Sequence, residues 1–156
     1  MRILSKSVKG TLKIGRAIAR NAKKGDIICL FGNLGSGKTV LAKGIAEGLG
    51  IKASEIVSPT FILIHGYEKA KLPLYHFDFY RLRSVKDILD LGYEEFFFGQ
   101  GISVVEWADR LKTLLPQAHL AIKLSVKGHN SRLFEFKAKG SRYEELLRKI
   151  NENIRH

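Results

Sequence analysis

The feature that most constrains this chain is a glycine-rich segment that matches the pattern G-x-x-x-x-G-K-[ST] at every fixed position. Its residues are Gly32, Asn33, Leu34, Gly35, Ser36, Gly37, Lys38 and Thr39. Glycines allow the backbone of such a loop to curl, so that successive N–H groups point at phosphate oxygens. The lysine adds a positive charge at the β- and γ-phosphates, and the threonine hydroxyl is suited to ligate Mg²⁺. The segment therefore predicts a loop that binds a nucleoside triphosphate.

The sequence on both sides of this loop supports that interpretation. Residues 26–31 form a continuous apolar run, which predicts a strand buried on both faces. Residues 40–49 carry apolar side chains at the spacing of an amphipathic helix. A strand, a glycine loop and a helix in this order place the positive end of the helix dipole beneath the phosphates. The flanking pattern thus favours a phosphate-binding loop over a glycine-rich turn that only resembles one.

Composition narrows the class of protein further. The chain has 156 residues, and we expect one domain over 1–156. No apolar run is long enough to cross a bilayer, so no membrane association is expected. The single cysteine, Cys29, lies in the predicted strand, which indicates a reduced, cytoplasmic protein. The net charge of +12 favours a polyanionic or acidic partner, with a highly charged solvated surface as the alternative.

Part of this charge lies on a helix predicted over residues 8–24. Its basic residues recur at steps of three and four and form one stripe, made of Lys9, Lys13, Arg16, Arg20 and Lys23. We interpret the stripe as a solvated helix face, with contact to RNA or a partner as the alternative.

The remaining segments indicate an α/β fold. Strands are predicted at 61–64, 74–80, 101–105, 118–126 and 132–138, with helices from Ser84 to near Gly92 and from Ser141 onward, and turns near Gly66 and at 128–130. Strands alternate with helices early in the chain, and a hairpin comes late. We expect a three-layer fold of the P-loop nucleoside triphosphatase type, with a mostly parallel central sheet and antiparallel additions.

A phosphate loop also needs a carboxylate for its metal ion, usually at the end of a neighbouring strand. Glu106 follows the predicted strand 101–105 and is the first candidate. Asp78 is the second, because strand alternation places it on one face with His76 and Tyr80, and a carboxylate between aromatic residues needs a partner. Asp78 is therefore expected near the metal or the attacking water. His76 is expected to make a structural hydrogen bond.

The segment Ser58-Pro59-Thr60 follows the loop helix, where many nucleotide switches carry a sensor of the γ-phosphate. Its two hydroxyl groups are candidates to bond phosphate or Mg²⁺. A simple turn that leads into a strand is the alternative.

Four segments in this order and spacing resemble those of one family. They are 32–39, Ser58-Pro59-Thr60-Phe61, Tyr75-His76-Phe77-Asp78-Phe79-Tyr80-Arg81 and Val105-Glu106-Trp107-Ala108. Together they resemble the TsaE or YjeE family, the bacterial ATPases of tRNA threonylcarbamoyladenosine biosynthesis. The family loop often has Asp and Ala where this chain has Asn33 and Ser36. Because the loop acts through its backbone, these differences leave the expected function in place.

The resemblance implies a protein that binds ATP and Mg²⁺ and hydrolyses ATP weakly alone. It implies assistance to the TsaB and TsaD transferase subunits, which modify adenosine 37 of tRNAs that read codons beginning with A; any contact with tRNA would be indirect or transient. It also implies that Thr39 and Glu106 hold Mg²⁺, that Asp78 serves hydrolysis, and that Thr11, Trp107 and Arg132 lie near the nucleotide.

The expected catalytic residues are thus Lys38, Asp78 and Glu106. The expected nucleotide contacts are residues 32–39, Val40, Ser58, Thr60, Trp107, Thr11 and Arg132. No arginine finger is evident, and Arg81, Arg83 and Arg110 are the candidates. A small-molecule kinase and an RNA-binding scaffold are the alternatives, whereas a GTPase is disfavoured because the chain has no N-K-x-D sequence.

Overall fold

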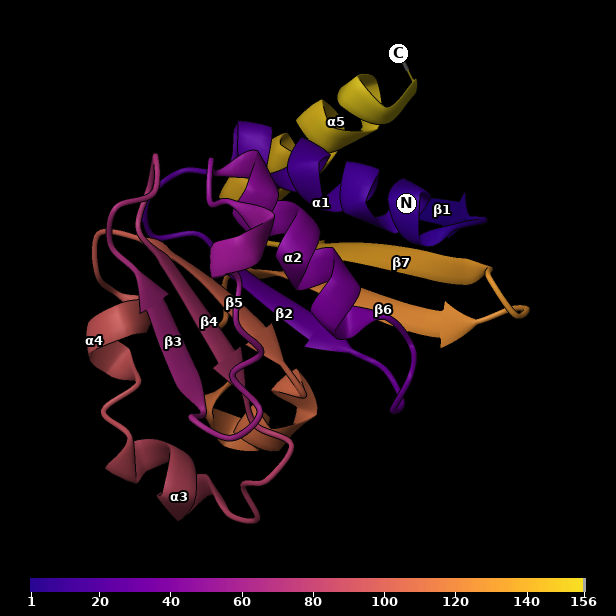
Figure 1. Ribbon diagram of the computed structural model, residues 1–156. Helices are drawn as coiled ribbons and strands as arrows, with labels where there is room; N and C mark the ends of the chain where they lie inside the picture. The colour runs from indigo at the N-terminus through magenta and orange to yellow at the C-terminus, as the bar shows by residue number, and fades with distance from the viewer. Residues whose placement is uncertain (156) are drawn as a thin grey trace.

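The structure is a computed structural model that describes residues 1–155; residue 156, the last of the expected domain, lies outside the described residues. Its centre is a seven-stranded sheet in the order β1-β7-β6-β2-β5-β4-β3 (Figure 1). The strands are β1 (Arg2–Ser5), β2 (Ile27–Phe31), β3 (Ile64–Tyr67), β4 (Leu74–Asp78), β5 (Ile102–Glu106), β6 (His119–Val126) and β7 (Arg132–Lys139). The helices are α1 (Val8–Asn21), α2 (Lys38–Gly48), α3 (Val85–Asp90), α4 (Glu94–Phe97) and α5 (Ser141–Arg155), with 3₁₀ segments η1 (Ala53–Glu55) and η2 (Ala108–Leu114).

Strand directions divide the sheet into a parallel centre and antiparallel margins. β6, β2, β5 and β4 are parallel neighbours, whereas β3 pairs with β4, β7 with β6 and β1 with β7 in antiparallel fashion. In the parallel part, Glu106 lies opposite Leu30 of β2 and opposite Asp78 of β4. The expected α/β class is confirmed, and the two candidate carboxylates lie at the carboxyl edge of the sheet, where such folds bind ligands.

Helices cover both faces of the sheet and complete three layers. On one face, α1, α2 and α5 cover a core that includes Ile18, Leu41 and Ile122 (Figure 1). On the other face, α3, α4 and η2 pack around a second apolar cluster that includes Phe77 and Phe97. Burial of this apolar surface on both sides supplies the main driving force for the fold.

Helix α2, which follows the phosphate loop, packs very closely against α1. A Cβ atom placed on Gly15 would lie 2.6 Å from the carbonyl oxygen of Leu41, and one on Gly44 would lie 2.6 Å from that of Leu12. Only glycine permits this approach of two backbones. An ion pair of 2.7 Å between Arg16 and Glu47 joins the same helices at the surface. The first turn of α2 is therefore held firmly relative to the sheet.

The predicted strand at 61–64 is wrong. Residues 60–63 form a turn, Leu63 has a φ of +67°, and its N–H donates to the carbonyl of Pro59 over 2.7 Å. A left-handed residue cannot continue a strand, so β3 begins at Ile64 and includes Gly66, which had been expected in a turn.

Other boundaries also differ. The predicted strand 74–80 ends at Asp78, the predicted helix 8–24 ends at Asn21, and β1 and α4 were not predicted. Of the basic stripe, Arg16 on α1 pairs with Glu47, and Lys23, which lies just after α1, is 3.6 Å from Glu145. Among residues 1–155, no helix has the length and apolar character that a bilayer crossing requires.

Candidate functional site

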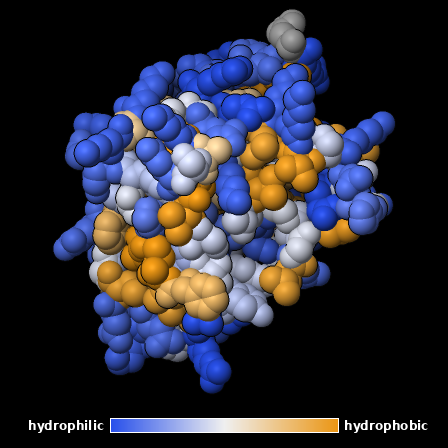
Figure 2. Space-filling model, in the orientation of Figure 1, coloured by the Kyte–Doolittle hydropathy of each residue, from blue (hydrophilic) through white to orange (hydrophobic). Residues whose placement is uncertain are grey.

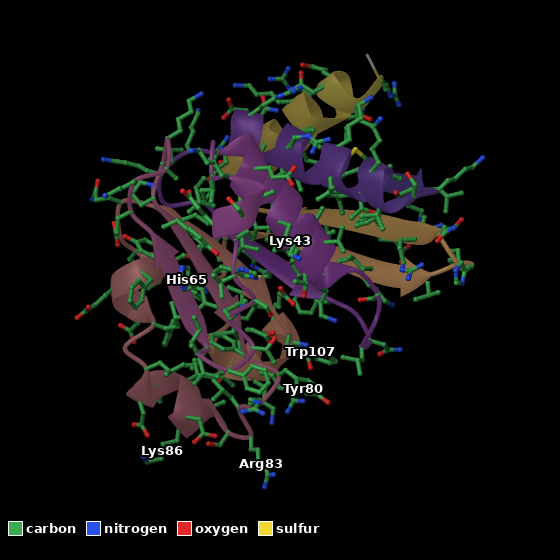
Figure 3. The ribbon with its side chains drawn as sticks, in the orientation of Figure 1. Lys43, His65, Tyr80, Arg83, Lys86 and Trp107 are labelled. Carbon is green, nitrogen blue, oxygen red and sulfur yellow. The ribbon has the colours of Figure 1, made fainter. Side chains whose placement is uncertain are left out.

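A cavity of about 370 Å³ opens at the carboxyl edge of the parallel strands. It is lined by Leu34, Gly35, Ser36, Gly37, Lys38, Thr39, Val40, Thr60, Asp78, Tyr80, Glu106, Trp107 and Arg132. Figure 3 shows Tyr80 and Trp107 close together beside this edge. The cavity therefore unites the glycine loop, the two strand-end carboxylates and the segment after α2, which are far apart in the sequence.

The glycine loop leads directly into a helix N-terminus. Gly37 has a φ of +100° and caps α2, so that helical geometry begins at Lys38. The N–H of Ser36 donates back to the carbonyl of Asn33 over 3.1 Å and tightens the loop. The first N–H groups of a helix have no partner within the helix, and together with the helix dipole they form an anion-binding site. The predicted phosphate loop thus has the geometry that its sequence indicates.

Lys38 places its ammonium group inside this loop. Its Nζ donates to the carbonyls of Gly32 at 2.6 Å and Asn33 at 3.0 Å, and lies 4.0 Å from the centre of the Trp107 ring. Burial lowers the pKa of Lys38, whereas the negative charges of Glu106 and Asp78 act in the opposite direction. The ammonium is held by weak neutral acceptors, and phosphate oxygens are stronger acceptors that compete for it.

Glu106 is buried at the end of β5, and both of its oxygens accept hydrogen bonds. The hydroxyl of Thr39 donates to Oε2 over 2.9 Å, and Nε2–H of His76 donates to Oε1 over 2.8 Å. The expectation that His76 makes a structural hydrogen bond is confirmed, with Glu106 as its partner. A hydroxyl and a carboxylate in contact at a phosphate loop provide the hard oxygen donors that Mg²⁺ prefers.

Asp78 is the second buried carboxylate, and its partners come from two other segments. The hydroxyl of Thr60 donates to Oδ2 over 2.9 Å, and the backbone N–H of Tyr80 donates to Oδ1 over 3.0 Å. The backbone N–H of Asp78 donates to the carbonyl of Leu63 over 2.9 Å. Asp78 therefore faces the cavity while being held by the turn at 60–63. Its lack of a bond to Thr39 distinguishes its environment from that of Glu106.

Arg132 joins the β6–β7 turn to the phosphate loop. Its Nη1 donates to the carbonyls of Gly128 and Ser131, both at 3.1 Å, and its Nη2 donates to the carbonyl of Gly35 at 3.3 Å. Its buried Nε has no hydrogen-bond partner within residues 1–155. Arg132, which the family resemblance implied to lie near the nucleotide, thus lines the cavity and retains a free donor within the described residues.

Four of the expected nucleotide contacts lie outside the cavity lining. Thr11 is buried on α1, where its hydroxyl donates to Oγ of Ser5 over 3.1 Å. Ser58 contacts the hydroxyl of Thr60 at 2.9 Å and is one step removed from Asp78. Gly32 lies with Asn33 in an adjoining hollow, so that the lining of the main cavity begins at Leu34.

Tyr80 lines the cavity but was not predicted as a site residue. Its ring lies 4.9 Å from that of Trp107, which itself adopts a left-handed backbone with a φ of +57°. The signal for Tyr80 was present in the sequence, since strand alternation placed it on the face of Asp78. The two rings form an aromatic wall beside Lys38.

Comparison with known proteins decides the family. The model of the family described as "Threonylcarbamoyl adenosine biosynthesis protein TsaE" matches residues 5–134. The chain belongs to the TsaE family. It is 45% identical over 142 residues to the tRNA threonylcarbamoyladenosine biosynthesis protein TsaE of Bacillus subtilis, covering 90% of this chain and 87% of the relative. It is 41% identical over 132 residues to the protein of the same name in Treponema pallidum, covering 85% of this chain and 96% of the relative.

A solved TsaE-family structure has the same fold. The crystal structure of Bacillus subtilis YdiB matches with a TM-score of 0.85 and 39% identity, covering 97% of this chain and 94% of that chain. The family predicted from the four sequence segments is confirmed, as is the fold. The match to the family model also covers the phosphate loop and both carboxylates.

Proposed function

We propose that this protein binds and hydrolyses Mg-ATP in order to assist the TsaB and TsaD subunits in forming threonylcarbamoyladenosine at position 37 of tRNAs that read codons beginning with A. It does not transfer the threonylcarbamoyl group itself. The contact between the Thr39 hydroxyl and Glu106, 2.9 Å long and set at the end of a phosphate loop, is the observation that carries the proposal. Membership of the TsaE family supports the tRNA-modification role.

In this proposal the phosphates bind to the backbone N–H groups of the loop, and the Lys38 ammonium moves from the loop carbonyls to phosphate oxygens. Thr39 and Glu106 would hold Mg²⁺, and the ion would supply positive charge that neutralises the phosphates. Asp78 orients the attacking water and accepts its proton. Thr60, which donates to Asp78 over 2.9 Å, responds to the γ-phosphate.

The arrangement of the arginines favours slow ATP hydrolysis by the isolated protein. Among residues 1–155, Arg132 is the only arginine that lines the cavity, and its guanidinium is engaged by backbone carbonyls. An arginine that reaches the γ-phosphate increases turnover by roughly 10³-fold or more in related enzymes. We therefore assign stimulation of hydrolysis to the partner subunits. We place this function in the cytoplasm, because the single cysteine, Cys29, is buried and forms no disulfide.

The experiment measures phosphate release from ATP with the purified protein, with and without the TsaB and TsaD subunits. Release is expected to need Mg²⁺ and to rise when the subunits are added. Asp78→Asn should retain Mg-ATP binding but lose stimulated release, whereas Lys38→Ala should lose nucleotide binding. Exposed Arg148 on α5 provides the control variant Arg148→Ala.

Two results would contradict the proposal. The first is phosphate release that stays the same with and without the subunits. The second is the appearance of label from γ-labelled ATP in a metabolite rather than in free phosphate, since that outcome indicates a small-molecule kinase.

A further inference from the structure

A second hollow, of about 530 Å³, adjoins the nucleotide cavity and is lined by Tyr80 and three arginines, Arg81, Arg83 and Arg110. Tyr80 belongs to both cavities, so one aromatic side chain separates them. Figure 3 shows Arg83 beyond Tyr80, at the bottom of the view and away from Lys43 of α2. We call the second hollow the arginine pocket.

The positive charges of the arginine pocket have almost no counter-charge. Arg81 lies over the Phe61 ring at 4.3 Å, and within residues 1–155 the guanidinium groups of Arg81 and Arg83 have no carboxylate within 4.0 Å. Arg110 donates to the carbonyl of Leu82 over 3.1 Å, and its Nε lies 4.0 Å from Asp109. Three cations around one hollow repel each other, and an anion placed among them relieves that repulsion. The planar guanidinium is also suited to bidentate binding of a carboxylate or phosphate.

Exposed apolar side chains lie next to the arginine pocket, because its Arg81 packs over the Phe61 ring and Ile62 follows Phe61 in the chain. Phe61 is 75% exposed and Ile62 is 51% exposed, although both are large hydrophobic residues. Figure 2 shows hydrophobic surface on the side of the molecule where the lower ends of β3 and β4 lie in Figure 1. Aromatic residues and arginine are enriched at the centres of protein interfaces, and an aliphatic side chain such as Ile62 offers nothing to a nucleic acid backbone. The combination favours a protein partner over RNA.

We infer that the arginine pocket, together with the exposed side chains of Phe61 and its neighbour Ile62, is a docking surface for an acidic segment of a protein partner. This inference rests on the proposed function, because the partner that docks here is the complex proposed to stimulate ATP hydrolysis. Carboxylates of the partner enter between Arg81, Arg83 and Arg110, and apolar side chains of the partner cover Phe61 and Ile62.

The docking surface is connected to the catalytic carboxylate through two short paths. The backbone N–H of Tyr80, next to Arg81, donates to Asp78 Oδ1 over 3.0 Å. The hydroxyl of Thr60, next to Phe61, donates to Asp78 Oδ2 over 2.9 Å. A partner seated on this surface therefore contacts both segments that hold Asp78, and binding there regulates the position of the group that orients water.

The first test measures the affinity of the purified TsaB–TsaD complex for the double variant Arg81→Ala/Arg83→Ala by calorimetry. The matched control, Arg148→Ala/Arg155→Ala, removes the same charge from exposed positions of α5. Interface arginines at hot spots change affinity by about tenfold or more, so a loss of this size is expected for the pocket variant alone. Its ATP hydrolysis without partner and its melting temperature should match the wild type.

Equal affinities of the two double variants would overturn the inference while leaving the proposed function intact. A wild-type protein that fails to bind the complex would overturn both. If the pocket variant instead loses binding of tRNA and keeps its affinity for the protein complex, the surface belongs to nucleic acid and the inference is wrong.

The second test identifies the chemical group that enters the pocket. Arg83→Lys introduces a primary amine, which a carbodiimide couples to a nearby carboxylate as an amide. Mass spectrometry of the cross-linked complex should find position 83 joined to an Asp or Glu of a partner subunit. Arg148→Lys is the control and should give no such product. A complex that forms normally but gives no link at position 83 would contradict an acidic occupant.

Discussion

Replacement of Thr39 by Val is the change that most directly tests the proposed metal site. Valine keeps the shape of threonine and removes the hydroxyl, which donates to Glu106 Oε2 over 2.9 Å. Glu106 is only 2% exposed, so water does not readily replace this donor. The other oxygen of Glu106 keeps its bond from His76 at 2.8 Å, which confines the damage to one hydrogen bond.

The size of the effect follows from this geometry. A hydrogen bond to a charged group contributes about 1.5–3 kcal/mol, so the free energy of unfolding without nucleotide should fall by about that amount. If the same hydroxyl ligates Mg²⁺, the gain in ATP affinity on adding Mg²⁺ should shrink by about tenfold to a hundredfold, since about 1.4 kcal/mol corresponds to a factor of ten. Thr39→Ser keeps the hydroxyl and should preserve most of both quantities.

Two measurements check these values: urea unfolding without nucleotide, and calorimetric titration with ATP at zero and saturating Mg²⁺. The Glu106→Gln variant and the Thr39→Val/Glu106→Gln double variant complete a double-mutant cycle. Because the two side chains are in contact, their coupling energy should be about 0.5–3 kcal/mol. A Thr39→Val protein with wild-type stability and an undiminished Mg²⁺-dependent gain in ATP affinity would contradict the proposed metal site, as would strict additivity in the cycle.

Three further predictions concern buried groups outside the cavity. Burial raises the pKa of Cys29 to about 12, so its thiol should not react with an aromatic disulfide reagent at pH 8 until denaturant unfolds the chain. Burial lowers the pKa of His119 below its usual value of 6.5, so on acidification the unfolded state binds a proton before the folded state does. With respect to this group, the free energy of unfolding should be constant above pH 6.5 and should decrease as the pH falls toward the pKa of the folded state. Urea unfolding of the His119→Asn variant should show a smaller decrease. Tyr143→Phe leaves the buried N–H of Ile27 without its 2.8 Å acceptor and should lower the free energy of unfolding by about 1–3 kcal/mol, measured by urea unfolding.

The parts of the fold that the sequence predicts well are those specified by local pattern. The loop at 32–39, the strand before it and the helix after it each carry their signal within a few residues, and the structure has all three. Glu106 was identified because it ends an apolar strand, and Asp78 because strand alternation placed it on one face with His76 and Tyr80, where a carboxylate needs a partner. Parallel strands that end at one edge bring such residues together without further information.

The parts that sequence reasoning missed depend on distant partners. β1 is recognisable only through its pairing with β7, in which Arg2 lies opposite Glu135. The run Phe61-Ile62-Leu63-Ile64 has high strand propensity, yet Thr60 and Leu63 bond to Asp78 and hold the segment in a turn. Tertiary contacts override β-propensity in such cases. The burial of Thr11 against Ser5 likewise follows from where β1 lies.

Each carboxylate of the cavity accepts a hydrogen bond from a threonine hydroxyl, but the two threonines lie in segments that differ in how tightly they are packed. Thr39 is in the first turn of α2, which is packed backbone to backbone against α1. Thr60 is in a surface turn that leaves its neighbour Phe61 75% exposed. The Glu106 side is therefore rigid and the Asp78 side adjustable. Since a partner docked at Phe61 reaches only the adjustable side, its binding should change the rate of the hydrolytic step far more than the affinity for nucleotide.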